Sequence, residues 1–134
     1  MSNLTPGLSA ELKITVGEAD TASKWGSGLV PVYSTPAMVG LMEAAAVKAL
    51  DGQLEPGQTS VGGRIDVRHL AATPLGMSVH ARAELTAFNG RKLSFRVEAW
   101  DEVEKIAEGE HERFIMDVSR FMDRLAKKQA KPAP

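Results

Sequence analysis

The feature that most constrains how this chain folds is a nearly continuous apolar segment at residues 36–50. Within it, only Glu43 and Lys48 carry a charge. Thr35–Pro36, where the segment begins, is a typical helix start, and Asp51–Gly52 after it is a typical helix end. Because a helix that is hydrophobic on every side is normally buried, the segment predicts one long helix at the centre of the fold.

Much of the remaining chain alternates between apolar and polar residues, as β-strands do. The alternation predicts strands at residues 11–16, 60–70, 77–88, 92–100 and 105–116. It is cleanest in the third of these, where the odd-numbered positions from Met77 to Ala87 are apolar. Asn89–Gly90 predicts a hairpin between the third and fourth strands. Gly62–Gly63 predicts a β-bulge, or a close approach by a ligand, in the second strand.

The order of these elements indicates how they pack. Residues 17–32, rich in Gly, Ser, Ala and Thr, are expected to form a long lid or binding loop before the helix. Residues 118–128 are expected to form a terminal helical turn or two. Because one helix can cover only one face of a sheet, the 134 residues predict a single α+β domain. In this domain an antiparallel sheet wraps around one long central helix.

Composition and charge argue against several classes of function. The formal net charge is −1, which gives no electrostatic support for nucleic-acid binding. The chain has no cysteine, and its 3 histidines lack metal-ligand spacing, so neither a disulfide nor a metal site is expected. No run of about 18 apolar residues is present to span a membrane, and residues 1–10 lack a signal-peptide pattern. We therefore expect a cytoplasmic protein without membrane contacts.

Glu43 is the most unusual residue of the predicted helix. None of its neighbours one helical turn away can pair with it; these are Val39, Gly40, Ala46 and Val47. Burying an unpaired carboxylate destabilises the folded state or raises the pKa of the group. Such carboxylates are therefore often found at functional sites. Glu43 is therefore a candidate functional residue. The alternatives are that it lies on an exposed stripe or pairs with a distant basic group.

Taken alone, Thr35 and the histidines are weaker candidates. The simplest role of the Thr35 hydroxyl is to cap the helix, although a helix start also offers N–H groups and a partial positive charge to a developing oxyanion. Pro36 lacks an N–H, which removes one such donor. His69 ends a predicted strand, where sites are often assembled, but a lone histidine is more often structural. We interpret His80 as a surface residue and His111 as a charged strand residue.

Several segments together resemble the fluoroacetyl-CoA thioesterase-like family. In the order of the family they are Thr35-Pro-Ala-Met-Val-Gly-Leu-Met-Glu43, Leu54-Glu-Pro-Gly57, Val67-Arg-His69 with Ala71-Ala-Thr-Pro74, Arg91-Lys-Leu-Ser94 and His111-Glu-Arg113. The resemblance covers about residues 8–121, which we expect to form the ordered core. Residues 129–134 are expected to be a disordered tail.

The resemblance implies a homodimeric hotdog fold that hydrolyses short-chain acyl-CoA thioesters. It implies no cofactor, since coenzyme A is part of the substrate. The catalytic Thr, Glu and His of the family fall on Thr35, Glu43 and His69. Its substrate-contacting Gly and Arg fall on Gly62 and Arg113.

The lid departs from the family pattern. Members selective for fluoroacetyl-CoA resemble one another in carrying Phe where this chain has Gly26 and Leu29, with Trp25 and Tyr33 close by. Leu29 and Tyr33 are therefore predicted to contact the substrate. The departure favours short acyl-CoA thioesters in general over fluoroacetyl-CoA alone.

The spacing of two candidates raises the question of a shared site. Thr35 and Glu43 are separated by roughly 12 Å along one straight helix, so they cannot meet at one carbonyl within it. We expect a complete site to need two chains, with Thr35 of one facing Glu43 of the other across a two-fold axis.

Other functions on the same fold stay open. A non-catalytic acyl-CoA or acyl-ligand binding module is the main alternative. A hydratase would need a His and an Asp placed together near the helix start, and we find no such pair. A purely structural protein would have little use for the Thr35, Glu43 and His69 set.

Overall fold

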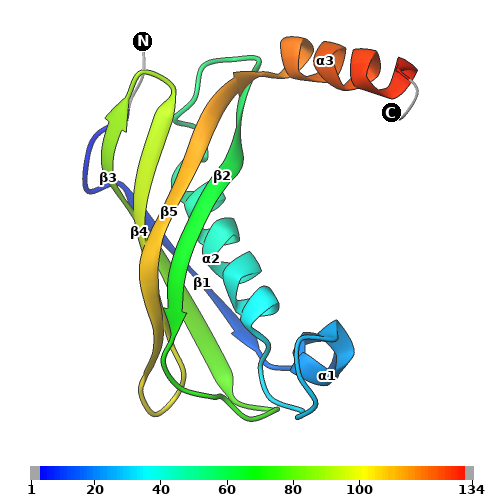
Figure 1. Cartoon of the computed structure of the whole chain (residues 1–134). Helices are drawn as coiled ribbons and strands as arrows, with labels where there is room; N and C mark the ends of the chain where they lie inside the picture. Colours follow the sequence, from blue (N-terminus) through cyan, green and yellow to red (C-terminus); the bar gives the residue numbers. More distant parts are fainter. Residues whose placement is uncertain (1–3, 132–134) are drawn as a thin grey trace.

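The computed structural model describes residues 4–131 and contains one sheet and one long central helix (Figure 1). Along the chain the elements are β1 (Ser9–Thr15), η1 (Glu18–Asp20), α1 (Ala22–Trp25), α2 (Thr35–Ala49), β2 (Gln58–His69), β3 (Ser78–Asn89), β4 (Lys92–Trp100), β5 (Lys105–Asp117) and α3 (Val118–Ala130). The strand order is β1-β3-β4-β5-β2, and every neighbouring pair is antiparallel. The predicted α+β arrangement is therefore confirmed.

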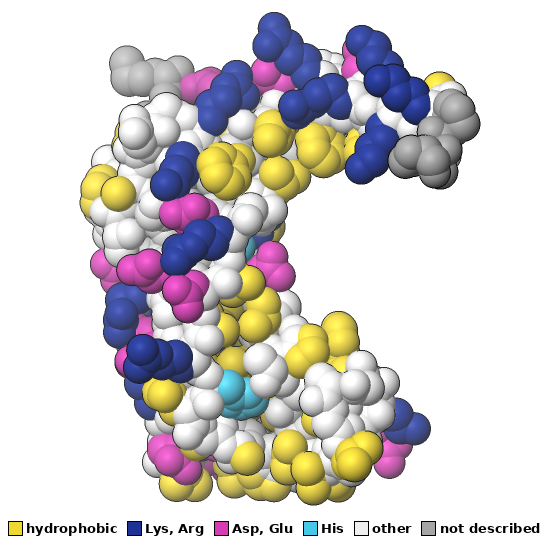
Figure 2. Space-filling view, viewed as in Figure 1, with side chains coloured by type: hydrophobic (Ala, Val, Ile, Leu, Met, Phe, Trp, Pro, Cys, Tyr) yellow, Lys and Arg dark blue, Asp and Glu magenta, His cyan; other side chains and the backbone are white. Residues whose placement is uncertain are grey.

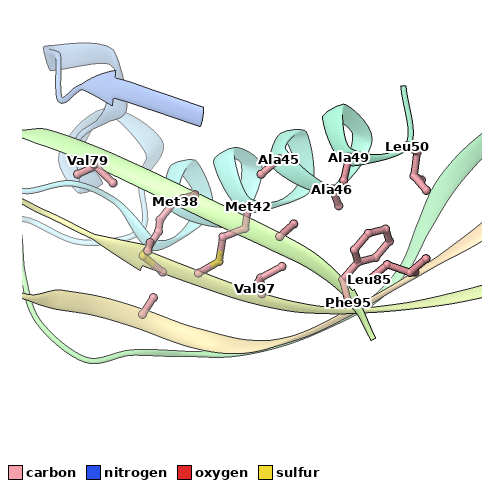
Figure 3. Close-up of a cluster of buried hydrophobic side chains, with 14 of the residues drawn as sticks. Met38, Met42, Ala45, Ala46, Ala49, Leu50, Val79, Leu85, Phe95 and Val97 are labelled. Carbon is pink, nitrogen blue, oxygen red and sulfur yellow. The ribbon is translucent and has the colours of Figure 1, made fainter. Parts of the chain in front are cut away.

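The core lies between α2 and the concave face of the sheet (Figure 3). On the helix side it consists of Met38, Met42, Ala45, Ala46 and Ala49. On the sheet side it includes alternate residues of β3 and β4, among them Val79, Leu85, Phe95 and Val97. The three alanines allow the helix to lie close to the sheet, and the two methionines fill the irregular space that remains.

Three details differ from the sequence predictions. A register shift between Leu85 and Ala87 ends the alternation, so Ala87 is exposed. The segment 17–32 is not one continuous loop, because it folds into η1 and α1. Gly26, in a left-handed conformation, ends α1. Helix α3 extends to Ala130, beyond the predicted turn or two and into the expected tail, and residues 132–134 lie outside the described part.

The molecule is hollowed on the side where α2 faces outward, between α3 and α1 (Figures 1 and 2). Gly40, Ala44 and Val47 form an exposed stripe on this side of α2. Strand β2 is an edge of the sheet, so one side of its backbone has no strand partner within the chain. The prediction that α2 is buried on every side is therefore wrong for the single chain, which covers only the sheet-facing side.

Helix α3 continues from β5 and projects from the body (Figure 1). Its side chains Val118, Met122 and Leu125 are exposed, and their spacing places them on one face. Figure 2 shows hydrophobic side chains on the side of α3 that borders the hollow. No helix within residues 4–131 combines the length and the apolar character needed to cross a membrane.

Candidate active site

The hydroxyl of Thr35 contacts His69 rather than capping the helix. Ser34 is the N-cap residue, because its Oγ accepts a hydrogen bond from the Ala37 N–H at 3.2 Å. The simplest role foreseen for Thr35 is therefore wrong. Its Oγ1 lies 2.7 Å from Nδ1 of His69, a residue 34 positions further along the chain. The start of α2 and the end of β2 thus bring a hydroxyl and an imidazole into direct contact.

The environment of His69 favours the neutral imidazole. Burial lowers the pKa of His69 below its ordinary value of 6.5, and the backbone of Ala71 partly opposes this shift. Its other ring nitrogen, Nε2, is buried and makes no hydrogen bond within the described residues. A neutral imidazole beside a hydroxyl can act as a general base, and its second nitrogen remains available to a further partner.

Thr35 and His69 line a hollow of about 400 Å³ beneath the lid segment. Tyr33 lines the same hollow, as do Gly28, Val30 and Ala71. Of the two predicted lid contacts, Tyr33 is therefore close to the Thr35–His69 pair. Leu29 is 98% exposed and does not line this hollow.

Glu43 lies in a second, smaller hollow of about 180 Å³, together with Gly62, Gly63 and His111. Its side chain is 41% exposed, and its Oε2 is 3.8 Å from Nη1 of Arg113. The prediction of a buried, unpaired carboxylate is therefore wrong, and the alternative of a distant basic partner is confirmed. The helix places the carboxylate on the open side of α2, within reach of β5.

Gly62 and Arg113 shape the surroundings of Glu43. The β2–β5 register shifts between Gly62 and Arg64, which confirms the predicted bulge. A Cβ on Gly62 would lie 2.9 Å from Glu43 Oε2, so a larger residue there would push the carboxylate out of its present position. Arg113 is 6% exposed and donates from Nε to Ser60 Oγ at 2.8 Å and from Nη2 to the Ser60 carbonyl at 3.0 Å.

His111 is a part of this cluster that the sequence interpretation missed. It is 1% exposed, and its Nε2 lies 3.2 Å from Nη1 of Arg113. The i, i+2 spacing of His111 and Arg113 on a strand was a usable signal, because it places both side chains on the same face. The flanking Glu110 and Glu112 obscured it by suggesting a charged surface strand.

The predicted site residues therefore fall into two clusters within one chain. The first contains Thr35, His69 and Tyr33, and the second contains Glu43, Gly62 and Arg113. The two hollows share no lining residue. Within residues 4–131 no three His, Asp or Glu side chains are grouped so that they could hold a metal ion.

Comparisons with known proteins point to one family. Residues 16–119 match the family model described as fluoroacetyl-CoA-specific thioesterase. A protein of Streptantibioticus cattleyicolor named fluoroacetyl-CoA thioesterase is 46% identical over 97 residues, which are 72% of this chain and 70% of that protein.

Solved structures agree with this match. A point mutant of the fluoroacetyl-CoA-specific thioesterase superposes with a TM-score of 0.88 at 36% identity, covering 96% of this chain and 99% of that one. A thioesterase superfamily member from Thermus thermophilus superposes with a TM-score of 0.89 at 30% identity, covering 96% of each chain. A hot-dog-like protein from Thermanaerovibrio acidaminovorans is also similar, with a TM-score of 0.88 at 25% identity and 96% of each chain covered. The predicted hotdog fold is thus confirmed.

Proposed function

The chain belongs to the fluoroacetyl-CoA-specific thioesterase family, and from this membership we propose that it hydrolyses short-chain acyl-CoA thioesters using Thr35, His69 and Glu43. It is an acyl-CoA thioester hydrolase, as its family and its named relatives indicate. The observation that carries the residue assignment is the 2.7 Å contact between Thr35 Oγ1 and His69 Nδ1. A hydroxyl held against a neutral histidine is a common arrangement for acyl transfer.

In the proposed reaction His69 serves first as general base and then as general acid. Water, or the Thr35 hydroxyl in a two-step variant, attacks the thioester carbonyl while His69 takes its proton. The C–S bond then breaks, and His69 returns the proton to the sulfur of the departing CoA. In the two-step variant a water molecule hydrolyses the acyl-Thr35 ester. The products are a carboxylic acid and free CoA, and the positive end of the α2 dipole would stabilise the oxyanion.

Glu43 completes this site from a second copy of the chain. Within one chain it lies roughly 12 Å from Thr35 along α2 and in a different hollow. His69 Nε2, buried and without a hydrogen bond among residues 4–131, lacks the partner that such a nitrogen normally has. A carboxylate from a partner subunit would supply it, and would activate the attacking water. In the alternative, Glu43 attacks the carbonyl, the C–S bond breaks to release CoA, and water then hydrolyses the acyl-Glu43 anhydride. We therefore propose a homodimer with two equivalent shared sites.

The open side of the chain supports this homodimer. The exposed stripe Gly40, Ala44 and Val47 runs along the same helix as Thr35 and Glu43. The free edge of β2 and the apolar face of α3 border the same hollow (Figures 1 and 2). A second copy in this hollow would bury apolar surface and bring its own α2 next to both clusters. If this side of the chain stayed in water, the apolar residues on the outer face of α2 would contribute nothing to the stability of the fold.

The substrate assignment is broader than the family name. The Streptantibioticus cattleyicolor relative is named for fluoroacetyl-CoA, whereas this chain has Gly26 and Leu29 in the lid. We propose that Tyr33 lines the acyl pocket and that Leu29 covers the substrate when the lid closes. No cofactor beyond the CoA of the substrate is proposed. The cytoplasmic location, and the lack of nucleic-acid and membrane partners, stay predictions from composition.

Release of free thiol from a panel of acyl-CoA thioesters tests the proposed function. The panel includes acetyl-, fluoroacetyl-, propionyl- and hexanoyl-CoA, because the short chains should be preferred and the longest should be poor. We expect thiol release with at least one short acyl group. Binding of acyl-CoA without release from any member would instead favour a non-catalytic acyl-CoA binding module.

Replacing Gly62 by alanine is expected to lower kcat by roughly tenfold or more, because the new Cβ would displace the Glu43 carboxylate. The matched control is Gly17→Ala, where the nearest atom to a new Cβ is 3.6 Å away, an ordinary contact. Both variants are compared by kcat and by thermal unfolding. An unchanged kcat in well-folded Gly62→Ala protein would contradict the proposed place of Glu43.

A further inference from the structure

His111 lies at the centre of the second cluster but has no role in the proposed reaction. Its ring is fully enclosed, in contact with β2 on one side and with Arg113 on the other. Its Nδ1 lies 2.8 Å from the carbonyl oxygen of Arg64, which is at the bulge of β2. Its Nε2 lies 3.2 Å from Nη1 of Arg113. Both ring nitrogens are thus engaged by groups whose hydrogen-bonding roles are fixed.

These two contacts determine the protonation state of the ring. A backbone carbonyl can only accept a hydrogen bond, so Nδ1 carries a proton and donates it. An arginine guanidinium can only donate, so Nε2 carries no proton and accepts. The arrangement is satisfied by one form of histidine, the neutral ring protonated at Nδ1. A cationic ring would direct an N–H at the cationic guanidinium and lose the second contact.

The same guanidinium nitrogen continues the chain of contacts to the proposed site. Nη1 of Arg113 faces both His111 Nε2 at 3.2 Å and Glu43 Oε2 at 3.8 Å. The other two nitrogens of Arg113 are held by Ser60, so the guanidinium has little freedom to turn. His111 and Ser60 therefore together hold Nη1 in place relative to the Glu43 carboxylate, and His111 is the one of the two that contacts Nη1 itself.

We infer that His111 is a positioning residue for the thioesterase reaction: its neutral ring holds the Arg113 guanidinium in place against Glu43. The inference rests on the proposed role of Glu43 and extends it to a residue that does not touch the substrate. Arg113 in turn holds the carboxylate in the orientation that it presents to the partner subunit's Thr35 and His69. Gly62 contributes to the same arrangement, since a Cβ there would lie 2.9 Å from Glu43 Oε2 and would push the carboxylate away from Arg113.

Protonation of His111 should therefore switch the site off. The charged groups that face the ring are Arg113 and Glu112 on β5 and Glu43 on α2. Burial lowers the pKa of His111 below 6.5 and the Arg113 charge lowers it further, while the Arg64 carbonyl and the charges of Glu43 and Glu112 partly oppose the shift. The ring is consequently neutral at pH 7, and activity that depends on it is present there and lost as the pH falls below 6.5.

Two substitutions separate positioning of Arg113 from a merely structural role. His111→Gln keeps an acceptor that can reach Arg113, and His111→Asn keeps a donor for the Arg64 carbonyl but loses that acceptor. We expect kcat/KM to fall roughly 10- to 100-fold in His111→Asn and by only about threefold in His111→Gln. The reverse order would overturn the inference, because it would mean that anchoring the β2 bulge is what matters. Thermal unfolding of both variants checks that they fold.

The pH profile provides a readout that a structural role would not move. In the wild type, protonation of either His69 or His111 inactivates the site, so log kcat/KM should fall with a limiting slope of about two on the acid side. In His111→Gln the slope should be about one. An unchanged slope in an active His111→Gln variant would refute the inference while leaving the proposed function intact.

The ring itself can be observed without any activity assay. Nitrogen-15 NMR of labelled wild-type protein at pH 7 should show His111 protonated at Nδ1 and unprotonated at Nε2. A ring that is protonated at Nε2, or at both nitrogens, would overturn the inference even if neither variant folds. If the wild type releases no thiol from any acyl-CoA, the proposed function fails, and the NMR result separately decides whether His111 holds Arg113.

Discussion

Replacing Glu43 by alanine is expected to lower acyl-CoA turnover by at least ~10²-fold while the fold is retained. The loss should fall mainly on kcat, because the carboxylate is proposed to act on the attacking water or the carbonyl and not on CoA binding. Stability should change little, because the side chain is half-exposed, its contact with Arg113 is 3.8 Å long, and Arg113 keeps its two hydrogen bonds to Ser60. His69→Ala is expected to reduce kcat to a similar extent, because no base would then face Thr35.

Matched controls make this result specific. Glu104→Ala removes an exposed carboxylate in the β4–β5 turn, and His80→Ala removes a histidine that stacks on Trp100 with ring centroids 4.8 Å apart. Neither residue lines the two hollows, so both variants should keep wild-type turnover. Steady-state thiol release and thermal unfolding are measured for all four variants. Near wild-type kcat in folded Glu43→Ala and His69→Ala proteins would refute the proposed roles.

A mixed dimer of two inactive variants is expected to regain about half of the wild-type activity. In a dimer of one His69→Ala chain and one Glu43→Ala chain, one site receives Thr35 and His69 from the second chain and Glu43 from the first. That site is intact, whereas the other site lacks both groups. The mixed dimer is isolated by carrying a different affinity tag on each chain, and its thiol release is compared with that of each parent variant.

The residues of the first cluster supply the control for this experiment. Thr35 and His69 contact each other within one chain, so a mixed dimer of Thr35→Ala and His69→Ala leaves both sites damaged. It should stay as inactive as its parents. If the His69→Ala and Glu43→Ala chains form a verified mixed dimer that also remains inactive, the site is not shared between subunits.

Local pattern was sufficient to predict most of the elements. Strand β4 was predicted at its observed bounds, and the bounds of α2 were predicted to within a residue, because periodicity and turn residues act over a few positions. The predictions failed where a contact from elsewhere in the chain intervenes. The lid segment folds back on itself, with the Ala22 N–H bonded to the Val32 carbonyl at 2.8 Å, and its end is held by the rest of the chain, because the Tyr33 N–H bonds to the Thr73 carbonyl at 2.9 Å. No residue pattern within 17–32 predicts these hydrogen bonds.

The site shows the same division more sharply. Glu43 was singled out from the sequence because a charge in an apolar helix is costly, and that argument needs only neighbours one turn away. The resemblance pointed to Thr35, His69, Gly62 and Arg113, but not to how they group. The role of His111 was missed because it depends on contacts with Arg113 and with the carbonyl of Arg64. Arg64 lies on another strand, so this contact is not visible in the local sequence.

The sequence by itself therefore determined the order of helix and strands, the apolar core and the unusual position of the Glu43 carboxylate in an apolar helix. These properties depend on short-range periodicity and on the cost of burying charge, which a linear chain already displays. Only the tertiary structure decided that Thr35 lies against His69 and that Glu43 faces Arg113 on the open side. The reason is that hydrogen bonds and ion pairs depend on distances of a few ångströms between residues far apart in the chain, and only packing of α2 against the sheet sets those distances.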